Sequence, residues 1–279
     1  MLRGGVLCHL AVGWGERPHV TPVVFVAHGG SLWFTTSRTS VKARAWRRDP
    51  AAAGLVRQGA RAVAFRGTVR TYDLLDPATW GRSLASVPRL TRAATAFTLR
   101  NARFFAGYAR DAARVPLAWT PPGRVFAELG LRAIAVLDLE AGAVVERAGA
   151  WPSPRRRPTR AYRRLARVAL TDRTVPDDVL DAVGISGEGA LGFLDPLTVL
   201  PARWRRDAGQ GCYLATLPAA FLDLATWREG QAGLTVDRRS AWRAREMRGM
   251  LLQGTARPSA PVPDGGEQAK AVARAGGRP

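Results

Sequence analysis

Four short segments near the start of the chain return, in the same order, near its end. LTVLPARW matches HVTPVVF, GCYLAT matches SLWFTT, TWREGQAGLTV matches AWRRDPAAAGLV, and QGTAR matches RGTVR. The spacings differ by only a few residues, apart from a longer gap before the last segment. Self-similarity of this kind indicates that one supersecondary unit has been duplicated. We therefore expect two domains of the same fold, and the 279 residues are enough for both.

The first copy is rich in predicted antiparallel β-strands. Short runs of β-branched and aromatic residues are separated by Gly and Pro in GWGERP and HGG, and they occupy residues 6–14, 19–28, 31–37 and 60–72. Between the third and fourth runs, TSVKARAWRRDP has helical character, with a hydroxyl residue to cap its start and Asp49-Pro50 to end it. The pattern predicts a mainly β domain with helices.

The periodicity changes after the fourth run. From residue 76 to residue 118, apolar residues recur at helical spacing on an arginine-rich background, which predicts a helical insertion packed against the sheet. Strand character resumes over residues 124–146 and closes the first domain. We therefore expect a first domain at residues 1–150, a basic and partly helical connector at 151–185, a second domain at 186–257 and a disordered tail at 258–279.

The formal net charge of +20 would ordinarily indicate a nucleic-acid or anionic membrane partner. Lysine occurs only at Lys42 and Lys270, so nearly all of the positive charge is arginine, spread along a chain that is also rich in Ala, Gly and Pro. This skew is typical of a GC-rich genome. The one dense basic run, residues 155–164, is interrupted by prolines and predicts a solvated linker. We expect no nucleic-acid partner.

Other classes of protein lack support in the sequence. No apolar run is long enough for a transmembrane helix and the opening residues do not form a secretion signal, so we expect a cytoplasmic protein without a membrane partner. Cys8 and Cys212 are too few for a disulfide framework, and His9, His19 and His28 lack metal-ligand spacing, so we expect no metal. The chain has no phosphate loop and no nucleophile elbow.

Residues 33–42, WFTTSRTSVK, carry the most informative chemistry. A strand ends in a cluster of hydroxyls, and a helix begins at once with a lysine in its first turn. Helix N-termini present unpaired N–H groups and the positive end of the dipole, which favour phosphate. Thr36, Ser40 and the Lys42 ammonium would add charge-assisted bonds of roughly 1.5–3 kcal/mol each. On spacing alone, an ordinary capped helix with a surface lysine explains the segment equally well.

The stretch from residue 7 to residue 70 resembles the pyridoxamine 5'-phosphate oxidase-like family of split-barrel flavoproteins. The resemblance rests on HLAVGWGERPHVTPVVFV, GGSLWFTTSRTSVKARAWRRDP and AVAFRGTVR as a set. It implies two tandem split β-barrels of the flavin-reductase and pyridoxamine-phosphate-oxidase type, an α+β fold that is mainly β. It also implies FMN as the cofactor, with the deazaflavin coenzyme of some relatives as the alternative.

The resemblance further implies which residues contact the cofactor. In the family, one strand lies along the flavin, and here the matching residues are Thr21, Pro22, Val23 and Val24. The stretch that matches Thr35 and Thr36 contacts the ring edge and the phosphate tail, and the positions that match Ser40 and Lys42 hold the phosphate. Many members have a second basic residue where this chain has Val41. Arg38 or Arg44 is a candidate to replace it.

Family members are commonly homodimers with the cofactor between two barrels, so the repeat implies a pseudo-dimer within one chain, while a homodimer of whole chains stays open. The second copy reads LPAAFL at residues 217–222, where a phosphate segment would need hydroxyls and a lysine. We therefore expect one complete site per chain, with the second barrel as its wall and Trp204 or Trp242 as candidates to lie near the ring.

The resulting hypothesis is an FMN- or deazaflavin-dependent oxidoreductase that acts on a small-molecule substrate, with no catalytic side chain assigned. The alternative is a non-catalytic cofactor- or haem-binding split-barrel module. Val41 and the missing second site favour that alternative, whereas the intact Thr35, Thr36, Ser40 and Lys42 favour retained cofactor binding.

Overall fold

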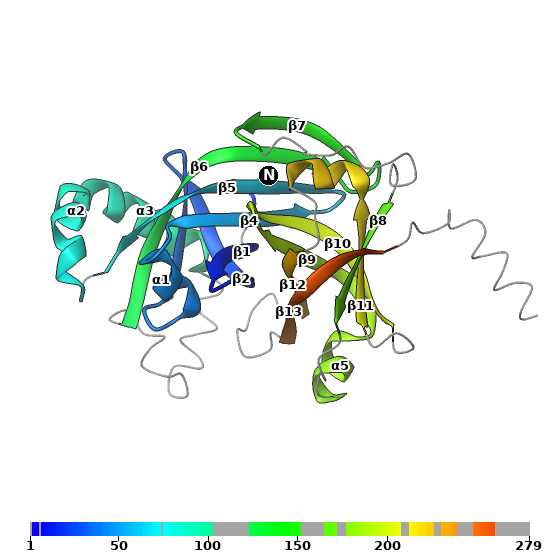
Figure 1. The fold of residues 1–279 in the computed structure, drawn as a ribbon. Coiled ribbons are helices and arrows are strands. Elements are labelled where there is room, and N and C mark those ends of the chain that lie inside the picture. The colour runs from blue at the N-terminus through cyan, green and yellow to red at the C-terminus, as the bar shows by residue number, and fades with distance from the viewer. Residues whose placement is uncertain are drawn as a thin grey trace, which may run out of the picture.

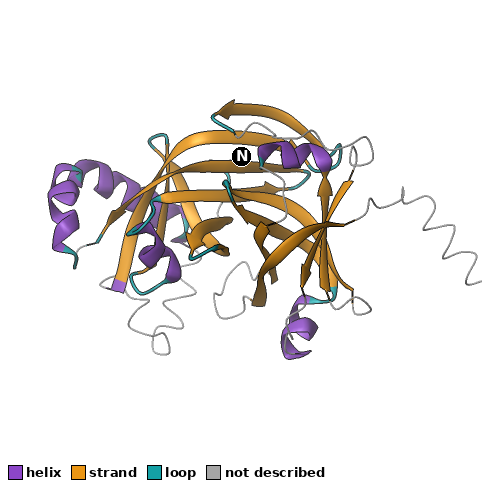
Figure 2. Ribbon diagram, viewed as in Figure 1, coloured by secondary structure: helices purple, strands orange, loops and turns teal. Residues whose placement is uncertain are grey.

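The computed structural model describes residues 2–5, 7–73, 75–102, 123–151, 165–171, 177–207, 212–225, 230–238 and 248–259. Strands make up most of these residues, and the helices lie at the periphery (Figure 2). The expected mainly β fold with helices is confirmed. The basic run at residues 155–164, Trp242 and the chain from residue 260 lie outside the described residues.

The first barrel is an antiparallel ring of six strands in the order β3-β2-β1-β4-β5-β6, closed by the pairing of β3 with β6. A seventh strand, β7, extends the sheet beside β6. Apolar side chains on alternate positions fill the ring, among them Leu10, Phe25, Phe34 and Phe65. The strands are β1 (Leu7–Trp14), β2 (Arg17–His28), β3 (Ser31–Ser37), β4 (Ala51–Gln58), β5 (Arg61–Tyr72), β6 (Arg124–Asp138) and β7 (Ala143–Gly149).

The ring is split between β2 and β3. Residues 17–24 of β2 pair with β1, whereas β2 pairs with β3 only from Phe25 to His28. The last residues of β3, Thr35–Ser37, pair with β6 instead. Helix α1 (Val41–Trp46) follows β3 directly and packs against β1, β3 and β5. The strands that the resemblance associates with a cofactor therefore separate at the residues predicted to contact it.

The helical insertion packs on the side of the first barrel away from the second barrel (Figure 1). It begins with a 3-10 turn, η1 (Pro77–Thr79), and continues as α2 (Trp80–Ala85) and α3 (Val87–Arg100). Ala93 and Phe97 of α3 cover Val24, Val26 and Trp33. The part of the expected insertion at residues 103–118 lies outside the described residues. No helix in the described ranges is both long and apolar enough to cross a membrane.

The second barrel is a closed ring in the order β10-β11-β8-β13-β12-β9. When β9–β13 are set against β1–β5, the neighbours are the same as in the first ring, and β8 takes the place of β6. This shared order is what a duplication would leave, and the duplication stays a prediction. The strands are β8 (Leu165–Thr171), β9 (Ser186–Leu194), β10 (Leu197–Asp207), β11 (Cys212–Pro218), β12 (Gly230–Arg238) and β13 (Arg248–Ser259).

Two boundaries differ from the expected ones. Residues 151–185 were expected to connect the barrels, but β8 lies within them and belongs to the second barrel, followed by helix α5 (Asp177–Val183). Its sequence, LARVALT, is short and lies in an arginine-rich segment, so the sequence pattern did not identify it as a strand. The second barrel requires this strand because β11 and β13 would otherwise have unpaired edges. At the other end, β13 continues to Ser259, two residues into the expected tail.

The two barrels pack through reciprocal pairs of strands. Strand β2 contacts β9, β12 and β13, and its counterpart β10 contacts β1, β4 and β5. Buried apolar residues of both barrels form one cluster there, which includes Ala11 and Val20 from the first barrel and Leu191 and Leu234 from the second. Such reciprocity is the property of an isologous interface between two copies of one fold.

Candidate cofactor site

Lys42 spans the split between β2 and β3. Its Nζ atom donates a hydrogen bond of 2.5 Å to the Thr21 hydroxyl on β2, although Lys42 itself lies in the first turn of α1. The helix starts there because the Ser40 hydroxyl accepts the Ala43 N–H at 3.1 Å, which is the geometry of an N-cap. Lys42 is only 9% exposed, so the sequence-based alternative of a surface lysine is wrong.

The Lys42 ammonium is buried without a negative partner. Burial, with a smaller contribution from the nearby Arg124, lowers the pKa of Lys42 from its ordinary 10.5 to about 8. Burial also raises the pKa of the Cys8 thiol, so this neighbour stays neutral. Among the described residues, no carboxylate lies within ion-pair distance of Nζ. Because an unpaired buried charge is costly, the site favours an anionic ligand.

Besides Thr21, the other predicted hydroxyls bond to the helix cap and to Arg124. The Thr36 hydroxyl donates to Ser40 Oγ at 3.1 Å, which ties the end of β3 to the helix cap. Arg124 of β6 donates from Nε to Thr35 Oγ1 at 2.9 Å and from Nη2 to the Thr35 carbonyl at 3.0 Å. The structure therefore joins Lys42 to Thr21, Ser40 to Thr36, and Thr35 to Arg124.

Arg124 is the residue that the sequence analysis missed. It reaches the site because β6 closes the ring beside β3 and sets Arg124 opposite Ser37. Val41, at the position where the resemblance leads us to expect a second basic residue, is half-buried and uncharged. Arg124 supplies a second positive charge from another strand. Nothing near Arg124 in the sequence signals this role, since the pairing of β3 with β6 links residues far apart along the chain.

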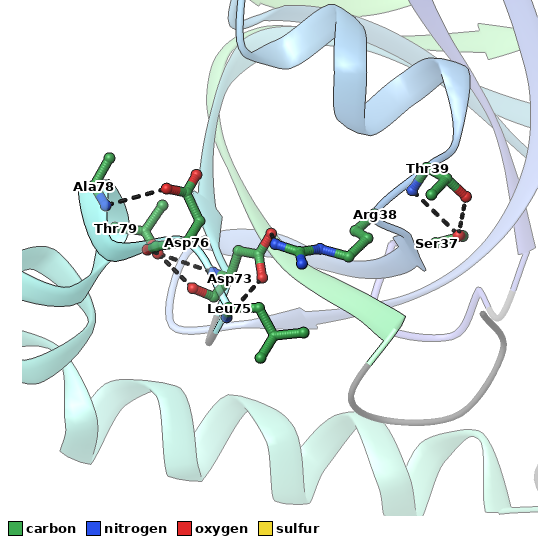
Figure 3. A network of polar contacts seen from close by, with 8 residues as sticks. All are labelled: Ser37, Arg38, Thr39, Asp73, Leu75, Asp76, Ala78 and Thr79. Carbon is green, nitrogen blue, oxygen red and sulfur yellow. Dashed lines mark hydrogen bonds and ion pairs between the residues drawn. The ribbon is translucent and has the colours of Figure 1, made fainter. Parts of the chain in front are cut away.

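Arg38, a predicted substitute for the missing second cation, forms an ion pair with a buried carboxylate. Its Nη2 atom pairs with Asp73 Oδ2 at 2.7 Å (Figure 3). Asp73 also accepts the Leu75 N–H at 3.0 Å, and its main chain exchanges hydrogen bonds with the Thr79 hydroxyl. This network joins the loop after β3 to the end of β5 and the start of the helical insertion, so it fixes the loop that precedes Ser40.

Arg44, the other predicted substitute, lies on the outer side of α1. Its guanidinium sits over the Trp14 ring at 5.1 Å from the centroid, and Arg48 lies over the same ring at 5.3 Å. Arg44 is exposed. The structure thus places Arg44 in a cation–π contact rather than beside the buried ammonium of Lys42.

The four predicted residues of β2 do not share one environment. Val23 points into the first barrel, and Val24 packs beneath α3. Thr21 and Pro22 instead line a cleft of about 240 Å³ between the barrels, which we call the inter-barrel cleft. Its remaining lining is Val20 of β2, Thr235–Asp237 of β12 and Gly249–Leu251 of β13.

His19 lies on the same side of β2 as Thr21, because alternate residues of a strand share a face. Burial and the positive charge of Lys42 together lower the pKa of His19 to about 4. Its imidazole is therefore neutral at physiological pH. Because the His19 ring is neutral, the Lys42 ammonium and Arg124 are the charged groups that we assign to the site.

The equivalent position in the second barrel is apolar. A 3-10 helix, η6 (Ala219–Leu224), follows β11 as α1 follows β3, and it buries Phe221, Leu222 and Leu224 in the barrel. Trp204, expected as a candidate near the ring, is buried against Tyr213 with ring centroids 6.1 Å apart and does not line the inter-barrel cleft. Trp242 lies outside the described residues.

The chain is similar to several solved structures at low identity. A FAD-binding protein from Mesorhizobium loti is 15% identical, with a TM-score of 0.35 over 48% of this chain and 87% of its own. An FMN-binding protein from Nostoc punctiforme, related to pyridoxamine 5'-phosphate oxidase, is 14% identical, with a TM-score of 0.33 over 76% and 86%. An F420 reductase is 22% identical, with a TM-score of 0.30 over 48% and 91%.

None of the curated proteins matches the chain. Residues 1–94 match the family model for pyridoxamine 5'-phosphate oxidase. The match covers β1–β5, α1 and most of the helical insertion as described, and so it includes the split between β2 and β3 and the hydroxyls around Lys42. Residues 1–94, which lie in the first barrel and its helical insertion, are thus similar to the pyridoxamine 5'-phosphate oxidase family.

Proposed function

We propose that the chain binds FMN in the split between β2 and β3 and uses it as an oxidoreductase on a small-molecule substrate. The observation that carries the proposal is the buried Lys42 ammonium, which donates to the Thr21 hydroxyl, lies near Arg124 and has no carboxylate partner among the described residues. A phosphate dianion is the ligand that satisfies two cations and several hydroxyl donors at once. The deazaflavin coenzyme, which also carries phosphate, is the alternative cofactor.

This chain's residues fit the parts of such a cofactor. Lys42 and Arg124 would hold the phosphate, with Thr35, Thr36 and Ser40 as further partners. Thr21 and Pro22 would line the ring on one side, and the β12 and β13 residues of the inter-barrel cleft would line it on the other. When bound, the flavin supplies the hydride-transfer chemistry, and the protein supplies its position and electrostatics.

The second barrel would act as the second half of a dimer. Reciprocal contacts between β2 and β12 and between β10 and β4 support a pseudo-dimer within one chain. The apolar residues of η6 support a single cofactor site, because Phe221 and Leu222 stand where the first barrel has the start of α1. This arrangement leaves open a homodimer of whole chains. Sedimentation of the purified protein measures the oligomeric state.

The test is a titration of the cofactor-free protein with FMN and, separately, with the deazaflavin, followed by fluorescence. Lys42→Ala is expected to weaken FMN binding about tenfold or more, because it removes one charge-assisted contact in a buried site. The control is Arg47→Ala, which removes an exposed positive charge from the end of the same helix. Equal affinities for wild type, Lys42→Ala and Arg47→Ala would contradict the site assignment.

A non-catalytic cofactor- or haem-binding module is the second candidate. The uncharged Val41 favours it, since this position offers a phosphate no second cation from the start of α1. A haem titration distinguishes the two functions. Tight binding with a Soret band, unchanged by Lys42→Ala, together with no FMN binding, would support the haem-binding module and exclude the flavin enzyme.

A further inference from the structure

The second barrel carries a cavity of about 460 Å³ where β9, β10 and β11 lie side by side. We call it the Arg203 cavity. Among the residues that the structure describes, it shares no lining residue with the inter-barrel cleft, so the two are separate places on the molecule. Its lining includes Ser186 and Glu188 of β9, Arg203 and Arg205 of β10, and Leu214 and Thr216 of β11.

Strand pairing sets these side chains on one face of the sheet. The residues opposite Arg203 on the two neighbouring strands are Glu188 and Thr216, and those opposite Arg205 are Ser186 and Leu214. Alternate residues of a strand share a face and lie about 7 Å apart. The guanidinium groups of Arg203 and Arg205 can therefore reach one small molecule that lies between them.

The Arg203 cavity has an excess of positive charge. Arg203 and Arg205 are both exposed, and neither forms an ion pair with a described residue. Asp207, the next residue on this face of β10, forms no ion pair with Arg205. The carboxylate of Glu188 is paired with Arg57 of β4 at 2.7 Å, so its negative charge is already offset. Because the two unpaired arginines repel each other, an anion between them would be stabilised.

We propose that the Arg203 cavity binds a small organic anion, a carboxylate or a phosphate monoester, that accepts hydrogen bonds from Arg203 and Arg205. Guanidinium groups bind both kinds of oxyanion through paired N–H donors. The Ser186 and Thr216 hydroxyls lie beside the two arginines in the register and can donate to further oxygens. Leu214 adds an apolar side chain to the lining, which suits the organic part of such a ligand.

The features of the Arg203 cavity favour a small molecule over a nucleic acid. Nucleic-acid binding depends on several cations that follow the phosphate backbone. Here two arginines line a hollow that also contains a carboxylate, Glu188. That carboxylate would repel a phosphate backbone laid across the hollow, whereas a small anion can bind at Arg203 and Arg205 alone.

The experiment is isothermal titration calorimetry of the purified protein with phenyl phosphate, benzoate and benzylamine, which share one ring and differ in the head group. We expect saturable binding of the two anions and none of benzylamine. Lys42 offers these anions another place to bind, so Lys42→Ala is titrated in parallel and should retain the binding. Loss of all anion binding in Lys42→Ala, or equal binding of benzylamine, would overturn the inference.

A double variant tests the two arginines directly. Arg203→Gln with Arg205→Gln should weaken the binding of both anions about tenfold or more, because charge-assisted contacts are lost. The matched control is Arg61→Gln with Arg132→Gln, which removes two exposed arginines from β5 and β6 of the first barrel and should bind as wild type does. Equal losses in the two double variants would mean that the protein responds to net charge alone, and the site assignment would be wrong.

Glu188 tests the sign of the charge that the cavity selects. Glu188→Gln should bind both anions more tightly, because a carboxylate leaves the lining while Arg203 and Arg205 remain. Weaker binding would contradict the proposed selection for anions. A single-stranded oligonucleotide that binds more tightly than phenyl phosphate, and that loses affinity when Arg203 and Arg205 are replaced, would assign the surface to nucleic acid and overturn the small-molecule site.

FMN titrations of the same variants keep this inference separate from the proposed function. If FMN affinity is unchanged in Lys42→Ala while replacement of Arg203 and Arg205 abolishes probe binding, the proposed cofactor site fails alone. If Lys42→Ala weakens FMN binding while the variant without Arg203 and Arg205 binds the probes as wild type does, the inference about the Arg203 cavity fails alone.

Discussion

At the scale of single residues, burial makes the positive charge of Lys42 unfavourable in the absence of an anionic ligand. Burial lowers its pKa to about 8, so the ammonium is charged at neutral pH and loses its proton under mildly alkaline conditions. Only the charged form attracts a phosphate. FMN affinity should therefore fall as the pH rises above about 8, by up to about tenfold per pH unit. Fluorescence titrations from neutral to alkaline pH measure this, and Lys42→Ala should show no such fall.

The same burial predicts an effect on stability. Because the pKa of Lys42 is lower in the folded protein than its ordinary 10.5, the unfolded state binds this proton more tightly. The free energy of unfolding should rise with pH between about 8 and 10.5, and below about pH 8 the buried charge costs on the order of 3 kcal/mol.

Lys42→Met removes the free-energy cost of the buried charge and also removes a group that would bind the cofactor. At neutral pH the cofactor-free variant should be more stable than wild type by about 1 to 3 kcal/mol, because an apolar side chain replaces a buried charge. Denaturant unfolding at several pH values checks this. Equal stability of the two proteins across the range, or a parallel rise of both with pH, would show that the ammonium is not desolvated.

At the scale of elements, the loop between β3 and α1 depends on the end of β5. Asp73→Asn would remove the ion pair with Arg38, and we expect a loss of about 1–2 kcal/mol in unfolding free energy because Asp73 is buried. Amide hydrogen exchange at residues 38–40 should become faster, and FMN affinity should drop several-fold as the helix cap loses order.

The control for that variant is Asp138→Asn. Asp138 accepts two backbone N–H groups in the turn after β6, far from Arg38, so the change leaves the loop before Ser40 intact. Exchange rates at residues 38–40 that are as slow in Asp73→Asn as in Asp138→Asn would show that the Arg38 ion pair does not order the loop.

At the scale of the whole molecule, the two barrels approach each other closely at glycine residues. A Cβ atom at Gly192 of β9 would lie 2.4 Å from the Val20 side chain of β2. Gly192→Ala should therefore destabilise the protein by about 1–3 kcal/mol and weaken FMN binding, because the second barrel can no longer approach β2. Gly254→Ala, where a Cβ meets nothing within 4 Å, should change neither quantity by much.

The stoichiometry of the cofactor also belongs to this scale. We expect about one FMN per chain at saturation, because the start of η6 offers Ala219, Ala220 and Phe221 in place of a hydroxyl cap and a lysine. Absorbance of bound flavin against protein concentration measures the ratio. A value near two would mean that the second barrel also holds a cofactor and that the apolar segment does not exclude it.

Local sequence patterns determined a substantial part of this protein. Alternating apolar residues placed β1, β2, β3 and β5, and Ser40 followed by an amphipathic turn placed α1, because these signals depend on neighbours along the chain. The order of hydroxyls and a lysine after β3 pointed to Thr36, Ser40 and Lys42 for the same reason. The strand order shared by the two rings agrees with the repeated segments.

Only the tertiary structure decided which distant residues complete the sites. Arg124 reaches Thr35 because β6 closes the first ring, and β8 joins the second barrel because the edges of β11 and β13 need a partner. The burial of Lys42 and the contact from Asp237 to His9 likewise arise only when the barrels are closed and packed together. Ring closure and barrel packing bring together residues far apart in sequence, and no local periodicity records which of them will meet.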